Sequence, residues 1–155
     1  LGVTDYRIPN SAIQASSSWD TNHGPHRGRL LLCRQGKRIG AWSARHNNRA
    51  QWLQVDIGVQ AKVTGVATQG RQALKQWVTS YVLAYSRSGI RFTTYRVRRR
   101  VKIFRGNKDR NSVVKHPLVP AIRGRYVRFY PKSWFAHISM RVELYGQRTG
   151  KENEE

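Results

Sequence analysis

A two-residue alternation of apolar and other side chains dominates this sequence and limits the folds that the chain can adopt. In "ISMRVELYG" (138–146) every second residue is apolar up to Leu144, and "WLQVDIG" (52–58) repeats the pattern with Leu53, Val55 and Ile57. Successive side chains of a strand point to opposite faces, so this period indicates strands with a buried face. No segment of helical length shows the i, i+3, i+4, i+7 pattern of an amphipathic helix. The sequence therefore predicts an all-β fold.

Other segments rich in β-branched and aromatic residues predict further strands: "KVTGVAT" (62–68), "WVTSYVLAY" (77–85), "FTTYRV" (92–97) and "RYVRFY" (125–130). Between them lie turn-forming clusters such as "SRSG" (86–89), "RGNKDRN" (105–111) and "PAIRG" (120–124). Many short strands joined by such turns are typical of an antiparallel sandwich or jelly roll. We therefore expect a β-sandwich of antiparallel strands.

The length of 155 residues fits one domain with a proper core. We expect this domain to cover residues 1–147, followed by a polar C-terminal tail, 148–155 ("RTGKENEE"). No apolar run approaches the length of a transmembrane helix, so no transmembrane segment is expected. Cys33 is the one cysteine, which rules out an intramolecular disulfide.

The chain is strongly basic, with 29 lysines and arginines against 8 acids and a formal net charge of +21. Self-repulsion on this scale opposes compactness and is relieved by an anionic partner. Nucleic acid, an anionic membrane and a sulfated glycan all meet this requirement. Charge alone does not choose among them.

Strand order predicts where many of these bases lie. If successive strands run up and down the sandwich, then segments 18–40, 70–76 and 98–100 and the turn 132–137 meet at one end. The basic residues brought together there would be Arg27, Arg34, Lys37, Arg38, Arg71, Lys75, Arg98, Arg99, Arg100 and Lys132. The same end would present the apolar side chains of Trp19, Leu31, Leu32 and Leu74. We take these residues as the candidate ligand-binding set.

The blocks "IPNSAIQASSSW", "QWLQVDIG", "VTGVATQGR", "WVTSYVLAYS", "RYVRFYPKSW" and "HISMRVELYG" occur in this order over residues 1–146. Together they closely resemble the discoidin family, also called the coagulation factor V/VIII type C domain. The resemblance implies a jelly-roll β-sandwich and an adhesion or recognition module, extracellular, secreted or peripheral at the cell surface. Members bind anionic phospholipids, glycans, collagen or protein receptors. Many tie their termini with a disulfide, but Gln147 stands here in the place of the second cysteine.

In the phospholipid-binding members, three loops called spikes project from one end, with apolar tips above a collar of bases. Placed by the flanking motifs, the spikes resemble residues 18–28, 31–40 and 71–76 here. These are segments that strand order also assigns to one end.

Each candidate feature also has a structural interpretation. The run "YRVRRRVKIFR" (95–105) can be a solvated strand face or a contact for a polyanion, and alternation would place Arg96, Arg98, Arg100 and Lys102 on one side. Trp19 and Leu74 can contact a membrane or pack on the sandwich end. Leu31 and Leu32 are adjacent on an extended chain, so at least one of them should be exposed.

Catalytic and metal-binding patterns are weak. His23 and His26 ("HGPH") with Cys33 lack the tight pairing and fourth ligand of a closed zinc site. The acids of residues 1–147 are scattered, with no oxygen-rich loop for calcium and no carboxylate pair. We therefore expect no catalytic residue, no metal and no cofactor, and a binding module rather than an enzyme.

The leading hypothesis is a loop end that binds either a membrane containing phosphatidylserine or a sulfated glycosaminoglycan. Apolar loop tips favour the membrane, whereas the surplus of arginine favours sulfate, which the guanidinium fork matches. A protein partner such as collagen or a receptor is an alternative. A nucleic-acid-binding role is a further alternative, and non-specific binding of nucleic acid at low salt is expected from charge.

Overall fold

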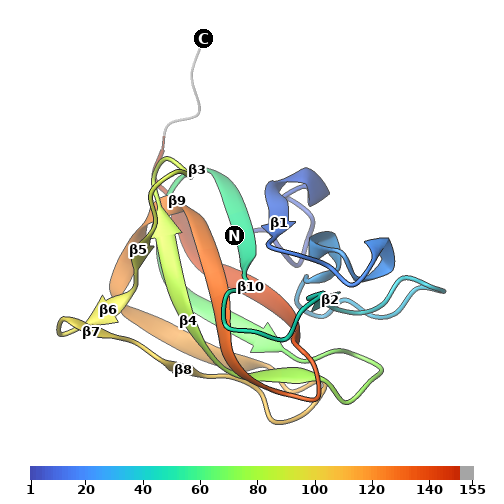
Figure 1. The fold of residues 1–155 in the computed structure, drawn as a ribbon. Helices are drawn as coiled ribbons and strands as arrows, with labels where there is room; N and C mark the ends of the chain where they lie inside the picture. The colour runs from blue at the N-terminus through green and yellow to red at the C-terminus, as the bar shows by residue number, and fades with distance from the viewer. Residues whose placement is uncertain (151–155) are drawn as a thin grey trace.

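A computed structural model of the chain describes residues 1–150. The structure is almost entirely antiparallel β-sheet, with three single-turn 3-10 helices near the N-terminus (Figure 1). In chain order the elements are η1 (Asn10–Ala12), β1 (Ile13–Ala15), η2 (Thr21–His23), η3 (Pro25–Arg27), β2 (Trp42–Ser43), β3 (Leu53–Gln69), β4 (Trp77–Ser86), β5 (Thr93–Thr94), β6 (Arg96–Val97), β7 (Arg100–Val101), β8 (Phe104–Arg105), β9 (Val114–Phe135) and β10 (Ser139–Arg148). The prediction of an all-β sandwich is confirmed.

Two long strands, β3 and β9, connect the layers of the sandwich. The strand order is β2-β10-β3-β9-β4-β5, with β1 added to β3 and β8 to β4. Residues 53–56 of β3 pair with 126–129 of β9, while residues 61–68 pair with 114–124, and the register shifts between these halves. The first half of β3 also pairs with β1 and the second half with β10. The sequence predicted two strands, 52–58 and 62–68, in place of β3.

The core follows the alternation on which the fold prediction rested. Ile138, Met140, Val142 and Leu144 are completely buried, as are Leu53 and Val55. Among the alternate residues of β10, Ser139, Arg141 and Glu143 are buried too. The chain N-terminal to β2 and the loops at the sandwich end cover that second face. These polar side chains consequently anchor loops, as described below.

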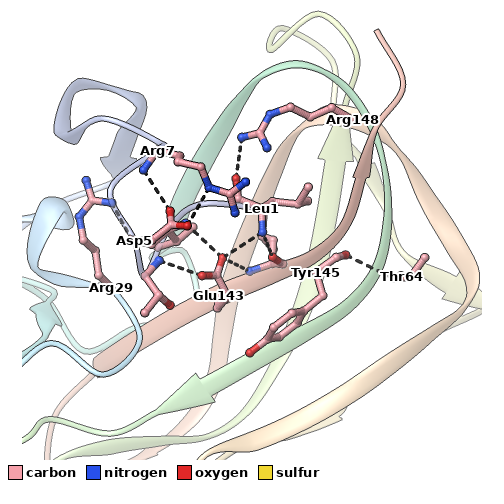
Figure 2. Close-up of polar contacts among 11 residues, drawn as sticks. Leu1, Asp5, Arg7, Arg29, Thr64, Glu143, Tyr145 and Arg148 are labelled. Atoms are coloured by element: carbon pink, nitrogen blue, oxygen red, sulfur yellow. Dashed lines mark hydrogen bonds and ion pairs between the residues drawn. The ribbon is translucent and has the colours of Figure 1, made fainter.

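Glu143 fastens the N-terminal segment to β10 (Figure 2). Its carboxylate accepts hydrogen bonds from the backbone N–H groups of Val3 (3.2 Å), Thr4 (2.8 Å) and Leu144 (2.9 Å), and lies 3.6 Å from the amino group of Leu1. Burial works to raise the pKa of Glu143, but the hydrogen bonds from Thr4 and Leu144 and the nearby amino group hold it below its ordinary value. The buried carboxylate is therefore ionised and fully bonded.

The segment after β4 departs from the predicted up-and-down order. β5 pairs only with Ala84 and Tyr85 of β4, and β8 pairs with Ser80 and Tyr81. Between them the chain leaves the sheet as a separate hairpin, β6-β7, turning at residues 98–99. Figure 1 shows this hairpin on the opposite side of the molecule from β2 and the loops beside it.

β10 continues past the expected domain boundary. Gln147 pairs with Lys62 and Arg148 with Ala61, and the N–H groups of Thr149 and Gly150 donate to the carbonyl of Gln60. Residues 151–155, the remainder of the predicted tail, lie outside the described residues. Within residues 1–150, no helix has the length and apolar character needed to cross a membrane.

Candidate functional site

Three loops form one end of the sandwich, and hydrogen bonds join them directly. The N–H of Ile39 in the second loop (31–40) donates to Asn22 in the first loop (18–28), at 3.1 Å. The N–H of Gln72 in the third loop (71–76) donates to Gly40 at the end of the second, also at 3.1 Å. We call the surface formed by these three loops the loop end. The sequence analysis also placed these three segments together at one end of the sandwich.

Buried arginines hold the loops in place without carboxylate partners. The Arg141 guanidinium donates to the carbonyls of Gly70, Leu32 and Arg110 and to the side chain of Asn111, at 2.8–3.0 Å. Burial lowers the pKa of Arg141 to about 10, so the group is still charged at neutral pH.

Arg27 plays the same part within the first two loops. Its guanidinium donates to the carbonyls of Ile39 and Cys33 and to the side chain of Gln35, at 2.8–3.2 Å. Arg27 is only 4% exposed. The prediction that Arg27 faces a ligand is wrong, because the η3 turn directs its side chain into the loop interior.

Apolar side chains protrude from the loops. Trp19 is 55% exposed and Leu74 is 47% exposed, from the first and third loops respectively. Leu31 is 59% exposed, whereas Leu32 is partly buried and Leu30 lies in the core. Leu31 has φ 68°, a left-handed conformation that turns its side chain outward while Leu30 stays inside. The expectation that at least one of Leu31 and Leu32 is exposed is confirmed.

A pocket of about 250 Å³ opens between the first and third loops. It is lined by Trp19, His23, Ser43, Arg71, Gln76 and His137. The indole of Trp19 meets the imidazole of His137 edge to face, with centroids 5.8 Å apart. Both ring nitrogens of His137 are already hydrogen-bonded, to the side chain of Asn47 at 3.1 Å and to the carbonyl of Ala44 at 2.6 Å. The pocket thus combines an aromatic face with a guanidinium, the imidazole of His23 and a hydroxyl. Such a set can hold an anionic or hydroxyl-rich group.

Local hydrogen bonds fix the polar groups of this pocket. The Arg71 guanidinium donates to the Gln76 side-chain oxygen at 3.0 Å, and the Ser139 hydroxyl donates to the same oxygen at 2.9 Å. His23 pairs with Asp20, which also accepts from the backbone N–H groups of Asn22 and His23 and so caps η2. The carboxylate in the first loop is therefore occupied within its own turn.

The electrostatic environment of the loop end is positive. Burial lowers the pKa of Arg71, and repulsion from Arg34 lowers it further. Burial likewise lowers the pKa of His26, with repulsion from Arg27, Arg29 and Arg38 adding to the effect. Added negative charge at this surface would relieve the repulsive part of each shift.

The loop end brings together most of the predicted binding residues. Arg34, Lys37, Arg38 and Lys75 are exposed, and Arg71 and Leu32 are half-buried. Lys37 lies at the tip of a tight turn closed by backbone hydrogen bonds between Gln35 and Arg38. Leu31 lies on the flank, beside Tyr6 and Arg29. Trp19, Leu74 and these bases form the candidate site.

Three predicted residues lie elsewhere, and a fourth lies within a strand rather than in a loop. Arg98, Arg99 and Arg100 belong to the β6-β7 hairpin, away from the first two loops (Figure 1). Lys132 lies inside β9, with its carbonyl accepting from Arg49 and its ammonium 5.7 Å from the Tyr130 ring. The predicted assignment failed because β5 is too short to carry the chain to the loop end, and because β9 continues to Phe135.

Sequence analysis missed the two imidazoles of the pocket. His137 follows Ala136, whose φ of 63° makes the tight turn between β9 and β10 and brings the ring beside Trp19. His23 was considered only as a metal ligand. Residues 1–150 contain no group of three or more His, Cys, Asp or Glu side chains placed to hold a metal ion.

Comparisons with known proteins agree with this geometry. Residues 12–144 match the F5/8 type C domain family. Lactadherin of Rattus norvegicus is 44% identical over 154 residues, covering 94% of this chain and 35% of its own length. The human EGF-like repeat and discoidin I-like domain-containing protein 3 is 40% identical over 149 residues, covering 93% of this chain and 30% of that protein. The chain spans about a third of the length of these relatives.

Among solved structures, discoidin II of Dictyostelium discoideum superposes with a TM-score of 0.82 and 26% identity, covering 92% of this chain and 57% of that one. The family match runs from β1 into the middle of β10 and includes all three loops of the loop end. This chain therefore belongs to the F5/8 type C domain family, the discoidin family.

Proposed function

We propose that this chain is a non-catalytic recognition module that binds an anionic phospholipid membrane through its loop end. One observation carries the proposal: Trp19 and Leu74 project, about half exposed, from two loops that are surrounded by bases. A protein that binds only a soluble anion has no need of exposed apolar side chains at such positions. A membrane offers both the headgroup charge and the hydrocarbon that this surface complements.

The bases supply most of the attraction. When the loop tips point toward an anionic surface, five bases face that surface: Arg34, Lys37, Arg38, Arg71 and Lys75. Each base near such a surface contributes about 1 kcal/mol, and this contribution declines with salt. Trp19 is suited to the interfacial layer because its ring is amphipathic. Binding is thus expected to need anionic lipid and to weaken with ionic strength.

A sulfated glycan is the second candidate for this end. The pocket beside Trp19 holds the Arg71 guanidinium and the His23 imidazole, and these groups can bind a sulfate or carboxylate of a sugar. In that case Leu74 would add little, because a glycan has no hydrocarbon interior to receive it. The contribution of Leu74 therefore separates the two candidates.

Sedimentation with vesicles that contain or lack phosphatidylserine tests the proposal. The wild-type chain should bind only the anionic vesicles. The triple variant Lys37→Gln/Arg38→Gln/Lys75→Gln should bind at least about tenfold more weakly. The matched control removes the same charge from exposed bases near the other end of β4: Arg87→Gln/Arg91→Gln/Arg123→Gln.

Equal losses in the two triple variants would show that net charge alone drives binding and would refute a loop-end site. Tight, salt-resistant binding of collagen, a receptor or a specific nucleic acid, with no vesicle binding, would favour the alternatives over the membrane. An extracellular or cell-surface location stays part of this proposal.

A further inference from the structure

A second basic surface lies along the segment from β6 to the loop after β8. Eight bases in residues 96–110 are exposed, and we call them the basic ridge: Arg96, Arg98, Arg99, Arg100, Lys102, Arg105, Lys108 and Arg110. The one acid in this segment, Asp109, is used locally, since its carboxylate accepts from the N–H and hydroxyl of Ser112. The ion pairs found within residues 1–150 all lie elsewhere. The ridge charges are therefore uncompensated within the described chain.

The hairpin shape holds these charges apart from the sheet. Arg98 and Arg99 have φ of 52° and 67°, the left-handed pair of a two-residue type I′ turn. Arg96 opposes Val101 and Val97 opposes Arg100, so bases emerge from both faces of the hairpin and from its tip. The long basic side chains at this tip repel one another, which is unfavourable without an anionic partner. The tip is accessible from three sides.

A groove of about 710 Å³ continues the ridge between β8, β4 and the start of β9. Lys102, Arg105 and His116 line it with nitrogen atoms, and Thr79 and Ser80 add hydroxyl groups. His116 directs Nε2 to the carbonyl of Arg105, at 2.6 Å. The hydroxyls of Thr79 and Ser80 already contact the Ser133 hydroxyl. The groove therefore offers the cationic groups of Lys102 and Arg105 along the same path as the hairpin.

The ridge begins away from the loop end and finishes beside its third loop. Its hairpin lies on the opposite side of the molecule from the first two loops, while its other end reaches the third loop through Asn111, which donates to the carbonyl of Gln72 (Figure 1). A ligand that follows the ridge must therefore be elongated. A single headgroup or phosphate would contact only one part of it.

We propose that the basic ridge is a second binding site, which takes a linear sulfated glycan chain. Five of the six ridge arginines lie in residues 96–105, and guanidinium groups match sulfate with paired N–H donors. Single-stranded nucleic acid is bound largely by stacking on exposed aromatic rings. The exposed apolar residues of the ridge and its borders are aliphatic (Val101, Ile103 and Val113), and Phe104 is buried. The ridge thus fits a glycan better than a nucleic acid.

Binding of a heparin dodecasaccharide to the 155-residue chain, measured by calorimetry at physiological salt, tests this site. Arg100→Gln/Lys102→Gln/Arg105→Gln should weaken binding by about 10- to 100-fold. The charge-matched Arg87→Gln/Arg91→Gln/Arg123→Gln variant should lose much less. The loop-end variant Lys37→Gln/Arg38→Gln/Lys75→Gln should bind heparin nearly as well as wild type while losing vesicle binding. The two proposals therefore fail independently.

Lysine acetylation of the wild-type chain gives a second measurement that needs no variant. Heparin should protect Lys102 and Lys108 and leave Lys37 and Lys75 reactive. Protection of Lys37 and Lys75 instead, or equal loss of binding in the ridge and charge-matched variants, would overturn the proposal. Equal or tighter binding of a single-stranded oligonucleotide of the same charge, lost in the same ridge variant, would overturn the assignment to a glycan.

Discussion

Arg141 is the side chain whose loss should most disturb the loop end. Its guanidinium makes four hydrogen bonds that join the second loop, the end of β3 and the loop at 110–111. Each hydrogen bond to a charged group contributes roughly 1.5–3 kcal/mol, but the buried charge loses several kcal/mol of hydration. Arg141→Met removes both the hydrogen bonds and the hydration cost of the buried charge, and it leaves four acceptors unbonded. We expect the free energy of unfolding to fall by about 3–5 kcal/mol.

Urea unfolding followed by tryptophan fluorescence measures this loss, with Arg123→Met as a control for removal of an exposed arginine, expected within about 0.5 kcal/mol of wild type. Hydrogen exchange adds a local test. The amides of Gln72 and Ile39, which join the loops, should exchange faster in Arg141→Met at urea concentrations where the core is intact. A loss below about 1 kcal/mol, or unchanged exchange at both amides, would refute the anchoring role.

Two further perturbations test the frame on which the loops are built. Glu143 has a lowered pKa, so its stabilising effect is complete above its ordinary value of 4.5 and is lost as the pH falls below it. Glu143→Gln should therefore be less stable than wild type at neutral pH in urea unfolding, with the difference shrinking toward about pH 3; a constant difference would contradict this. Gly146 has φ 145° and its Cβ would collide with the carbonyl of Lys62, so Gly146→Ala should lower the thermal unfolding midpoint more than Gly36→Ala, where φ is 62° and the space is open. Equal shifts in the midpoints would show that the register break after Tyr145 adjusts freely.

Much of the fold was predictable because period-two burial is a local property. The alternation in β10 and in the first half of β3 translated directly into completely buried side chains. The length of β3 and β9 was not predictable, since the register shifts that let one strand serve both layers depend on partners far away in sequence.

For the candidate site, too, features set by local sequence were predictable and features set by distant partners were not. Loops flanked by well-defined strands, such as 71–76 before β4, were placed correctly, and Trp19 and Leu74 are exposed as their polar neighbours suggested. The triplet Arg98–Arg100 was misplaced because its hairpin uses two arginines at positive φ, without the Asn-Gly signal that normally marks such a turn. The burial of Arg27 depends on carbonyls in the next loop, which no local pattern in the sequence reports.

The central claim is that apolar loop tips and surrounding bases act together on a membrane. Its most direct test is the affinity of Trp19→Ala/Leu74→Ala for vesicles containing phosphatidylserine, compared with Ile90→Ala, which removes an 85% exposed apolar side chain outside the loop end. We expect a loss of about tenfold or more for the double variant and no change for the control. Unchanged binding by Trp19→Ala/Leu74→Ala would contradict membrane recognition through the loop end.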